Sequence, residues 1–559
     1  MRTVLIALLA LACGPDVRRA GSQIVRRADS QIVRRADSPV GPRPAESRPY
    51  DFDILIINGT VIDGTGKPGV RADVGVRGDT IAEIGDLHGR TATTTLDATN
   101  DVVAPGFIDL LGNSQSAVLI DPKLEGKVRQ GVTTEVTGEG HSPGPIDEAM
   151  AAEMERTKPA GWPAVTWRTL ADFGHVVEKR GSAINFAFYI GAANPREIVL
   201  GHADRAPNAE ELKKMTAIVD QAMNEGAVGL ASALIYPPGS FATTEELTAL
   251  ARHGGAYWTH LRSESDRIDI AVDEAIHIAR DAHVPLNIFH LKIGGEKNWG
   301  RMSEVVARIE KSGVDYGGCV YPYTAASTDL ISIAPAWAQE GGYAQFVSRL
   351  KDPSTRTRIE DEMRAGRLQG KGASTILIRG TGKRLDAIAR EMNTDPAEAA
   401  ARLFEKQTSS PIAIFFSQSE DDMKIALKQP WVAVCSDSGA VVTRDEKGAH
   451  PRAYGTFPRV FRYVREQNLI TLEEAVRKMT SLAASRAFLK DRGVLRAGMK
   501  ADITVFDPKT IRDGSTYEDP HHFSEGVRHV VVNGRPVLQD GKMTGALPGR
   551  ILRKSSGVN

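Results

Sequence analysis

Residues 257–292 read YWTHLRSESDRIDIAVDEAIHIARDAHVPLNIFHLK. The two apolar runs at the ends of this stretch, Tyr257–Leu261 and Leu286–Leu291, have the length and composition of buried strands. Between them, apolar residues are spaced as on one face of an amphipathic helix. A strand, a helix and a second strand in this order form a βα unit, in which the two strands lie parallel. The stretch therefore predicts a parallel α/β fold.

The same unit recurs along most of the chain. Six more apolar runs of strand length alternate with helical patterns: Val102–Asp109, Thr133–Gly138, Ala183–Ala192, Ala227–Ala233, Tyr316–Tyr321 and Val432–Ser436. Eight βα units predict a closed (β/α)8 barrel of the TIM type. The interval from Tyr321 to Val432 is too long for one crossover. It predicts an insertion near residues 340–430 that contains helices and some strand.

Short β-rich runs with Asn-Gly and Gly-Asp turns lie at both ends of this repeating region. One set begins after Asp51, and the other lies between Ala501 and Gly534. Their shared character predicts one small β-sandwich domain that is assembled from both ends of the chain. The expected domains are 51–103 with 485–555 for this composite β-sandwich, and 104–484 for the barrel with its insertion.

The N-terminus has the form of an export signal. Arg2 is followed by the apolar run Val4–Ala12, so residues 1–12 are predicted to be a signal peptide and the protein to be periplasmic or secreted. Cys13 fits an imperfect lipoprotein cleavage box, which leaves a lipid anchor as an alternative. An eight-residue unit occurs twice in Ser22–Asp37 and precedes a Pro-rich stretch, so residues 13–50 are predicted to be a disordered tether. No other run approaches the length of a transmembrane helix.

Composition excludes several classes of protein. The chain has 559 residues, and its 70 Lys and Arg balance 70 Asp and Glu, so the formal net charge is zero. A nucleic-acid-binding protein would carry a basic excess to meet phosphates, and we therefore expect no nucleic-acid partner. The three cysteines include no Cys-x-x-Cys pair, which excludes a disulfide scaffold and a four-thiolate zinc site.

The active residues of a (β/α)8 barrel lie at the carboxyl ends of its strands. His260 and His290 stand at the ends of two consecutive predicted strands. A lone histidine at such a place is more often a hydrogen-bonded core residue. Two of them in register on neighbouring strands are expected to bring their imidazoles together as metal ligands.

Other strand ends supply further polar side chains. The second strand ends in a segment with glycines at positions 138 and 140, which presents Glu139 or His141 as a third ligand. The last strand delivers Asp437 to the same end of the barrel, where it is a candidate base. Lys292 follows His290 by two residues and is expected to share its face of the strand. Glu264 and Asp266, by contrast, are expected to be solvated loop charges.

Motifs spread over some 400 residues resemble one known family. Residues 51–550 are similar to the amidohydrolase superfamily and, within it, to the D-aminoacylase (N-acyl-D-amino-acid deacylase) family. The motifs that carry the resemblance are APGFID at 104–109, GVTT at 131–134, IYPPG at 235–239, ATTEEL at 242–247, THLR at 259–262, YPY at 321–323, WAQEGG at 337–342, SD at 436–437, HPR at 450–452 and GTFPR at 455–459.

The resemblance implies a fold, a reaction and a set of site residues. It implies a (β/α)8 barrel with a composite β-sandwich, bound zinc, and hydrolysis of an amide to a carboxylic acid and a D-amino acid. His260 and His290 match the family's zinc ligands, and Asp437 matches its catalytic aspartate. The residues that match those holding the substrate carboxylate are Lys292, Tyr321, Ser327 and Arg452. An arginine suits this role because a guanidinium fork binds carboxylate bidentately.

This chain departs from the family pattern at two places. The usual His-x-His after the first strand is replaced by Leu111 and Asn113, which cannot bind a second metal in the same way. The cysteine ligand at the end of the second strand is also missing. Glu139 is the expected replacement and His141 the alternative. A ligand set of nitrogen and oxygen admits manganese, cobalt or iron as well as zinc.

Two other functions remain open from the sequence. A cyclic-amide hydrolase of the dihydropyrimidinase type or a D-amino-acid dipeptidase would share the barrel, although Arg452 favours a substrate with a free carboxylate. A barrel that has lost activity and serves as a binding protein would be metal-free. The expected partner is a small N-acylated amino acid or a dipeptide, and the oligomeric state is not constrained.

Overall fold

A computed structural model describes residues 50–159, 161–442 and 448–554. The predicted signal peptide, the acceptor Cys13 and all of the tether except Tyr50 lie outside the described residues. The described residues from Tyr50 onward form one compact unit. Among the described helices, none has both the length and the apolar character that a membrane span requires.

The predicted fold class is confirmed, and all eight predicted barrel strands are present. Parallel pairing runs from each strand to the next through β8 (Phe107–Gly112), β9 (Val132–Thr137), β10 (Asn185–Phe188) with its continuation β11 (Ile190–Gly191), β12 (Leu230–Ala233), β13 (Tyr257–His260), β14 (Leu286–Ile288), β15 (Tyr316–Val320) and β20 (Val432–Val434). A parallel bridge between Gly112 and Ser438 connects the last strand to the first. The Asp437 amide donates to the Leu111 carbonyl at 2.8 Å beside it.

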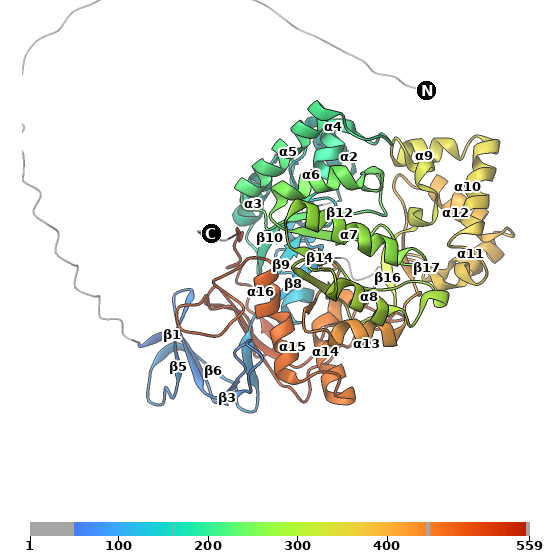
Figure 1. The fold of residues 1–559 in the computed structure, drawn as a ribbon. Coiled ribbons are helices and arrows are strands. Elements are labelled where there is room, and N and C mark those ends of the chain that lie inside the picture. The colour runs from blue at the N-terminus through green and yellow to red at the C-terminus, as the bar shows by residue number, and fades with distance from the viewer. Residues whose placement is uncertain (1–49, 160, 443–447, 555–559) are drawn as a thin grey trace, which may run out of the picture. The chain divides into compact units, whose positions relative to one another are not determined.

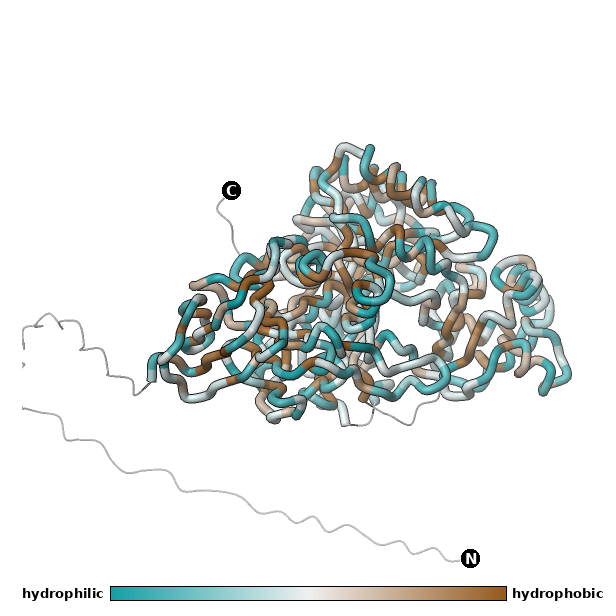
Figure 2. Tube along the Cα trace, turned by 90° about the horizontal axis from the view of Figure 1, so that it is seen from below, coloured by the Kyte–Doolittle hydropathy of each residue, from teal (hydrophilic) through white to brown (hydrophobic). Residues whose placement is uncertain are grey.

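Helices cover the outside of these strands, as amphipathic segments require. They are α1 (Glu125–Val128), α2 (Glu148–Thr157), α3 (Leu170–Arg180), α4 (Ala193–Leu200), α5 (Ala209–Asn224), α6 (Thr244–Gly254), α7 (Ile268–Ala282), α8 (Met302–Glu310), α13 (Glu420–Lys428), α14 (Arg452–Gln467), α15 (Leu472–Met479) and α16 (Ser481–Arg486). Thr243 caps α6 by accepting from the Glu246 amide at 3.2 Å. Apolar and polar stretches alternate along the trace in Figure 2.

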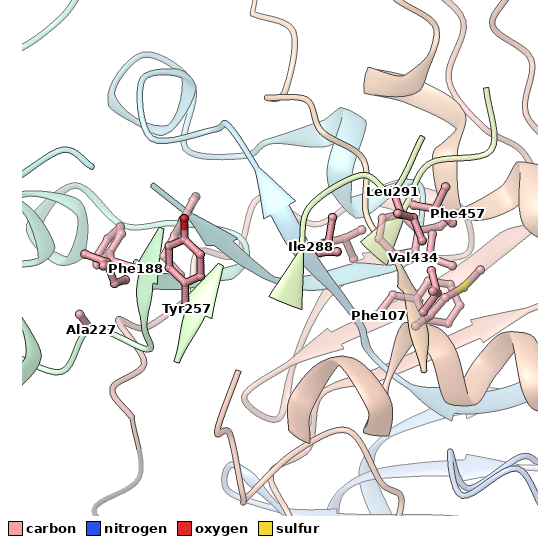
Figure 3. Close-up of a cluster of buried hydrophobic side chains, with 14 of the residues drawn as sticks. Phe107, Phe188, Ala227, Tyr257, Ile288, Leu291, Val434 and Phe457 are labelled. Carbon is pink, nitrogen blue, oxygen red and sulfur yellow. The ribbon is translucent and has the colours of Figure 1, made fainter. Parts of the chain in front are cut away.

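Strand alternation separates two hydrophobic layers. Tyr257 points to the helices and joins the large outer cluster, part of which is drawn in Figure 3. Trp258, the next residue, belongs to the cluster that fills the barrel interior and stacks on Phe289 at 5.0 Å between ring centroids. The free cysteines Cys319 and Cys435 are buried in the same interior cluster. The barrel interior is therefore a packed core and not a pore.

The β-sandwich is built from both ends of the chain. One sheet contains β5 (Thr80–Gly85), β4 (Asp73–Arg77), β1 (Phe52–Ile57) and β6 (Ala92–Asp97) in this order. The other runs β24 (Lys542–Met543), β23 (Arg535–Gln539), β22 (Val527–Val532), β21 (Ile503–Phe506), β7 (Val102–Pro105), β2 (Thr60–Val61) and β3 (Val70–Arg71). The two chain ends meet where β21 pairs antiparallel with β7. The predicted strand Val102–Asp109 is thus divided at Gly106 between the sandwich and the barrel.

The insertion is a small α/β layer with its own core. Its elements are β16 (Ala326–Asp329), α9 (Tyr343–Arg349), α10 (Pro353–Ala365), β17 (Ile376–Ile378), β18 (Lys383–Arg384), α11 (Leu385–Glu391), α12 (Pro396–Glu405) and β19 (Ile412–Phe415). Helices α9 to α12 form the yellow group in Figure 1. The insertion begins and ends earlier than the predicted 340–430, because β16 pairs with β19 immediately after the seventh barrel strand. Ser327 therefore belongs to the insertion.

Candidate metal centre and active site

Three predicted metal ligands come together at the carboxyl ends of three barrel strands. His260 is the last residue of β13, His290 follows β14 by two residues, and Glu139 follows β9 by two residues. Glu139 is carried past the strand by Gly138, which has a φ of 120°. A Cβ at this glycine would lie 2.8 Å from the Tyr189 carbonyl oxygen, so the close approach excludes a side chain.

The spacing of these three side chains suits a divalent metal ion. One oxygen of Glu139 lies 3.1 Å from Nδ1 of His260 and 3.0 Å from Nε2 of His290. One ligand atom from each residue lies within 4.8 Å of the others. Bonds of about 2.0–2.1 Å in a tetrahedral zinc site place neighbouring ligand atoms about 3.3 Å apart. The residues present therefore fit a metal with only a small outward shift, and three ligands leave a position for a water or substrate.

Glu264 lies beneath this cluster and is not the solvated loop charge that the sequence suggested. Its side chain is only 13% exposed. One carboxylate oxygen contacts Lys292 Nζ at 2.6 Å and His290 Nδ1 at 3.1 Å, and the other lies 3.4 Å from His260 Nε2. Glu264 thus faces the nitrogens of both histidines that point away from Glu139. No pattern in the sequence distinguishes it from the neighbouring Asp266, which pairs with Lys297 and is half exposed.

Three carboxylates act on the His290 side chain of this site. Burial and Lys292 lower the pKa of His290, but Glu264, Asp437 and Glu139 outweigh them and raise it to about 10. Burial opposes ionisation of Glu139, yet His290 and His260 hold its pKa well below the usual range. Glu264 is likewise kept ionised against its burial, and its pKa is lowered by His260, Lys292 and His290. An arrangement that stabilises a protonated imidazole so strongly also favours a bound cation.

Asp437 has a strained backbone conformation. Its φ is 49°, in the left-handed region that residues other than glycine rarely adopt. Its carboxylate accepts from Nη1 of Arg452 at 2.6 Å, and Nη2 of Arg452 donates to the Ser327 carbonyl at 3.1 Å. The guanidinium also lies over the ring of Tyr321, at 4.9 Å from its centroid. Among the described residues, Nε of this buried arginine has no hydrogen-bond partner.

A cavity of about 190 Å³ joins these groups. Of the predicted site residues, its walls include Glu139, His260, His290, Lys292, Ser327, Asp437 and Arg452. Tyr321 is buried behind the wall, where its hydroxyl bonds Gln418 at 3.0 Å. His141 points elsewhere and pairs with Glu197 at 3.0 Å, with 46% of its side chain exposed. The geometry thus favours Glu139 over His141 as the third ligand.

Several residues of the cavity were not anticipated. Tyr236 packs against His260 with 5.5 Å between ring centroids, and its hydroxyl contacts Thr328 of the insertion at 2.6 Å. The sequence pointed to Tyr236 only through its place in the IYPPG motif at 235–239. Asn113 lines the cavity, whereas Leu111 is buried in the barrel interior. Within the described part of the chain, only Glu139, His260 and His290 form a cluster suited to a metal.

Comparison with known proteins agrees with this geometry. Residues 413–538 match the model of the amidohydrolase family. A D-aminoacylase from Alcaligenes xylosoxydans xylosoxydans is 36% identical over 527 residues, which cover 92% of this chain and 100% of that protein.

Two solved structures have similar folds. One is a D-aminoacylase with a binuclear metal center, in which one metal activates the enzyme and the second attenuates it. It has a TM-score of 0.75 at 34% identity, and the match covers 90% of this chain and 100% of that chain. The other, N-acyl-D-glutamate deacylase from Bordetella bronchiseptica with zinc and a phosphonate mimic of the tetrahedral intermediate, has a TM-score of 0.75 at 32% identity, covering 90% and 99%. The identity extends over nearly the whole length of these proteins, and the chain therefore belongs to the D-aminoacylase family of the amidohydrolases.

Proposed function

We propose that this protein hydrolyses N-acyl-D-amino acids to a carboxylic acid and a free D-amino acid. The observation that carries the proposal is one cavity that combines Glu139, His260 and His290 with the carboxylate of Asp437. The named activities of the similar proteins, D-aminoacylase and N-acyl-D-glutamate deacylase, support the same reaction.

The cofactor of the proposed enzyme is one zinc ion held by Glu139, His260 and His290. When bound, such an ion would polarise the amide carbonyl and make a water molecule more acidic. Zinc is supported by the ion in the related deacylase, and the nitrogen and oxygen donors admit it. A single ion is supported by the substitution of Leu111 and Asn113 for a histidine pair, and by the one-metal activation of the related D-aminoacylase.

Asp437 moves the proton in the proposed mechanism. Its carboxylate lines the cavity and accepts the proton that the attacking water loses. It then returns this proton to the nitrogen of the leaving amine, which could not depart as an anion. Arg452, at 2.6 Å from Asp437, holds the carboxylate of this side chain in place during both transfers.

Arg452 also receives the carboxylate of the substrate. Two of its nitrogens are engaged by Asp437 and the Ser327 carbonyl, while Nε has no partner among the described residues. A buried N–H without an acceptor is costly, and an anionic substrate group would relieve that cost. Lys292 and Ser327 line the same cavity and complete the polar surface around the amino acid. Tyr321 supports the guanidinium from behind.

The test is a substrate screen with controlled metal content. Purified protein is incubated with N-acetyl-D- and N-acetyl-L-amino acids, D-containing dipeptides and a cyclic amide, and the free amine is measured. We expect hydrolysis of the N-acetyl-D-amino acids, loss of activity after a chelator, and recovery with zinc. Hydrolysis of the cyclic amide alone, or activity that survives complete removal of metal, would refute the proposal.

We also propose that the protein is exported to the periplasm or beyond. Support comes from the sequence alone, namely Arg2, the apolar run Val4–Ala12 and Cys13. Cell fractionation with mass spectrometry of the mature N-terminus tests this. Cleavage after Ala12 with a lipid on Cys13 would establish an anchored form, cleavage without lipid a soluble form, and an intact N-terminus in the cytoplasmic fraction would refute export.

A further inference from the structure

A buried cation lies behind the wall of the active-site cavity, where the mechanism above does not use it. Lys127, on α1, has a fully buried side chain. Its ammonium group contacts Asp109 at 2.7 Å and Glu135 at 3.1 Å, and both carboxylates are fully buried too. Three buried charges are expensive to desolvate, and hydrophobic residues of similar volume would often stabilise a fold equally well. The cluster thus calls for an explanation beyond stability.

The contacts of Lys127 lie on both sides of Asp437. Its Nζ donates to Ser436 Oγ at 2.8 Å and to the Ser438 carbonyl at 2.6 Å. Asp109 strengthens the first contact, because it accepts from the Ser436 amide at 2.9 Å and from the Ser436 hydroxyl at 2.5 Å. The residues before and after Asp437 are therefore held by the same buried pair.

Asp437 itself needs such support. A φ of 49° is unfavourable for an aspartate in isolation and persists only where the surroundings impose it. None of Lys127, Asp109 and Glu135 lines the cavity, so the cluster acts on the site through the backbone. The cluster connects β8, β9 and the segment after β20. The first and last barrel strands meet at this place.

We propose that Lys127 and Asp109 are positioning residues that hold the turn Ser436-Asp437-Ser438 and so aim the Asp437 carboxylate at the cavity. Glu135 completes the device from the neighbouring strand, since it binds the amide and hydroxyl of Ser114, and the Ser114 hydroxyl accepts from the Ala440 amide at 2.9 Å. The inference rests on the proposed function, because it assigns Asp437 the proton transfer.

Ser436→Ala is the first test, since it removes one hydroxyl and leaves every charge in place. A misplaced catalytic group typically costs up to about 100-fold in rate, and we expect kcat to fall at least about 10-fold with KM changed less than about twofold. Metal content and Tm should stay close to those of the wild type. The matched control is Ser232→Ala, a buried serine of β12 that bonds Tyr257 and Thr259, for which kcat should not change.

The double variant Lys127→Met with Glu135→Gln tests the cation itself. It removes one positive and one negative charge together, so the net charge of the buried cluster does not change and Asp109 is the one carboxylate that remains in it. In this variant kcat should fall further than in Ser436→Ala. If kcat in Ser436→Ala stays within twofold of an active wild type, the inference is overturned whether or not the double variant folds.

A crystal structure of Ser436→Ala separates this inference from the proposed function. A displaced Asp437 carboxylate supports positioning, and an unchanged one overturns it, even if the wild type proves inactive on every N-acyl-D-amino acid. In that last case only the proposed function fails.

Discussion

Replacing Glu264 by glutamine should weaken metal binding without touching a metal ligand. Glu264 contacts His290 Nδ1 at 3.1 Å and lies 3.4 Å from His260 Nε2. Partners of this kind orient ligand histidines and make their metal-binding nitrogens more basic. Glutamine keeps the size of the side chain and one acceptor oxygen, but it removes the negative charge that both imidazoles face.

The size of the effect follows from these two contacts. Loss of one such partner typically lowers metal affinity by about 10–100-fold, which is about 1.4–2.7 kcal/mol. Nδ1 of His290 lies 3.1 Å from Glu264 and also 2.7 Å from Lys292 Nζ, whereas Nε2 of His260, 3.4 Å from Glu264, makes no hydrogen bond among the described residues. Only the contact of Glu264 with His290 is therefore counted toward metal affinity. The glutamine variant should bind zinc about 10–100-fold more weakly.

The assay is competition for zinc against a chromogenic chelator. Glu274→Gln is a suitable control, because Glu274 is equally buried at 14% exposure but pairs with Arg262, away from the metal site. It should bind zinc like the wild type. Equal affinity of Glu264→Gln and the wild type would refute the role of Glu264 in supporting the two histidines.

Asp437→Asn should keep its metal and fold but lose about 10²–10⁴-fold in kcat, and substantial turnover in this variant would rule out Asp437 as the proton carrier. Arg452→Lys keeps the charge but loses Nε, the guanidinium nitrogen that has no partner among the described residues, so KM for N-acetyl-D-amino acids should rise about 10-fold, and kcat should fall too because Arg452 also holds Asp437; a KM equal to that of the wild type would show that Arg452 does not bind the carboxylate. Glu246→Ala leaves Arg196 buried without the partner that it contacts at 2.5 Å, and urea unfolding should show a loss of about 3–5 kcal/mol, whereas an unchanged midpoint would contradict this.

Much of the fold could be predicted from the sequence because barrel strands are short, apolar and regularly spaced. The division of Val102–Asp109 between two sheets could not, since both halves are equally apolar and only Gly106 marks the change. The start of the insertion was missed for a related reason. Its first strand, Ala326–Asp329, is polar and pairs with Ile412–Phe415, a partner far along the chain that no local pattern reveals.

For the site, residues at strand ends could be proposed, but residues in loops could not. His260, His290 and Asp437 follow apolar runs, so the barrel rule singles them out. Glu264 lies in the loop after β13, and its inward direction depends on the path of that loop back toward Lys292. Lys127 was missed because it looks like an ordinary charged residue of a short helix, although it is fully buried. Burial of a charge is a property of the assembled molecule.

The pairing of β7 with β21 has a consequence for how this protein acquires its structure. Thr504 Oγ1 donates to the Gly131 carbonyl across 373 residues of sequence, and the β7–β21 ladder lies beside it. Contacts of such long range form slowly, because the entropy of closing a large loop is lost before the contacts can stabilise the fold. Until β21 has been synthesised, β7 is paired only with β2, and its other edge is open to association with other chains. Strands β21 to β24 thus complete a sheet that β2, β3 and β7 begin, and a protein that lacks these four strands is expected to aggregate before a metal site can form.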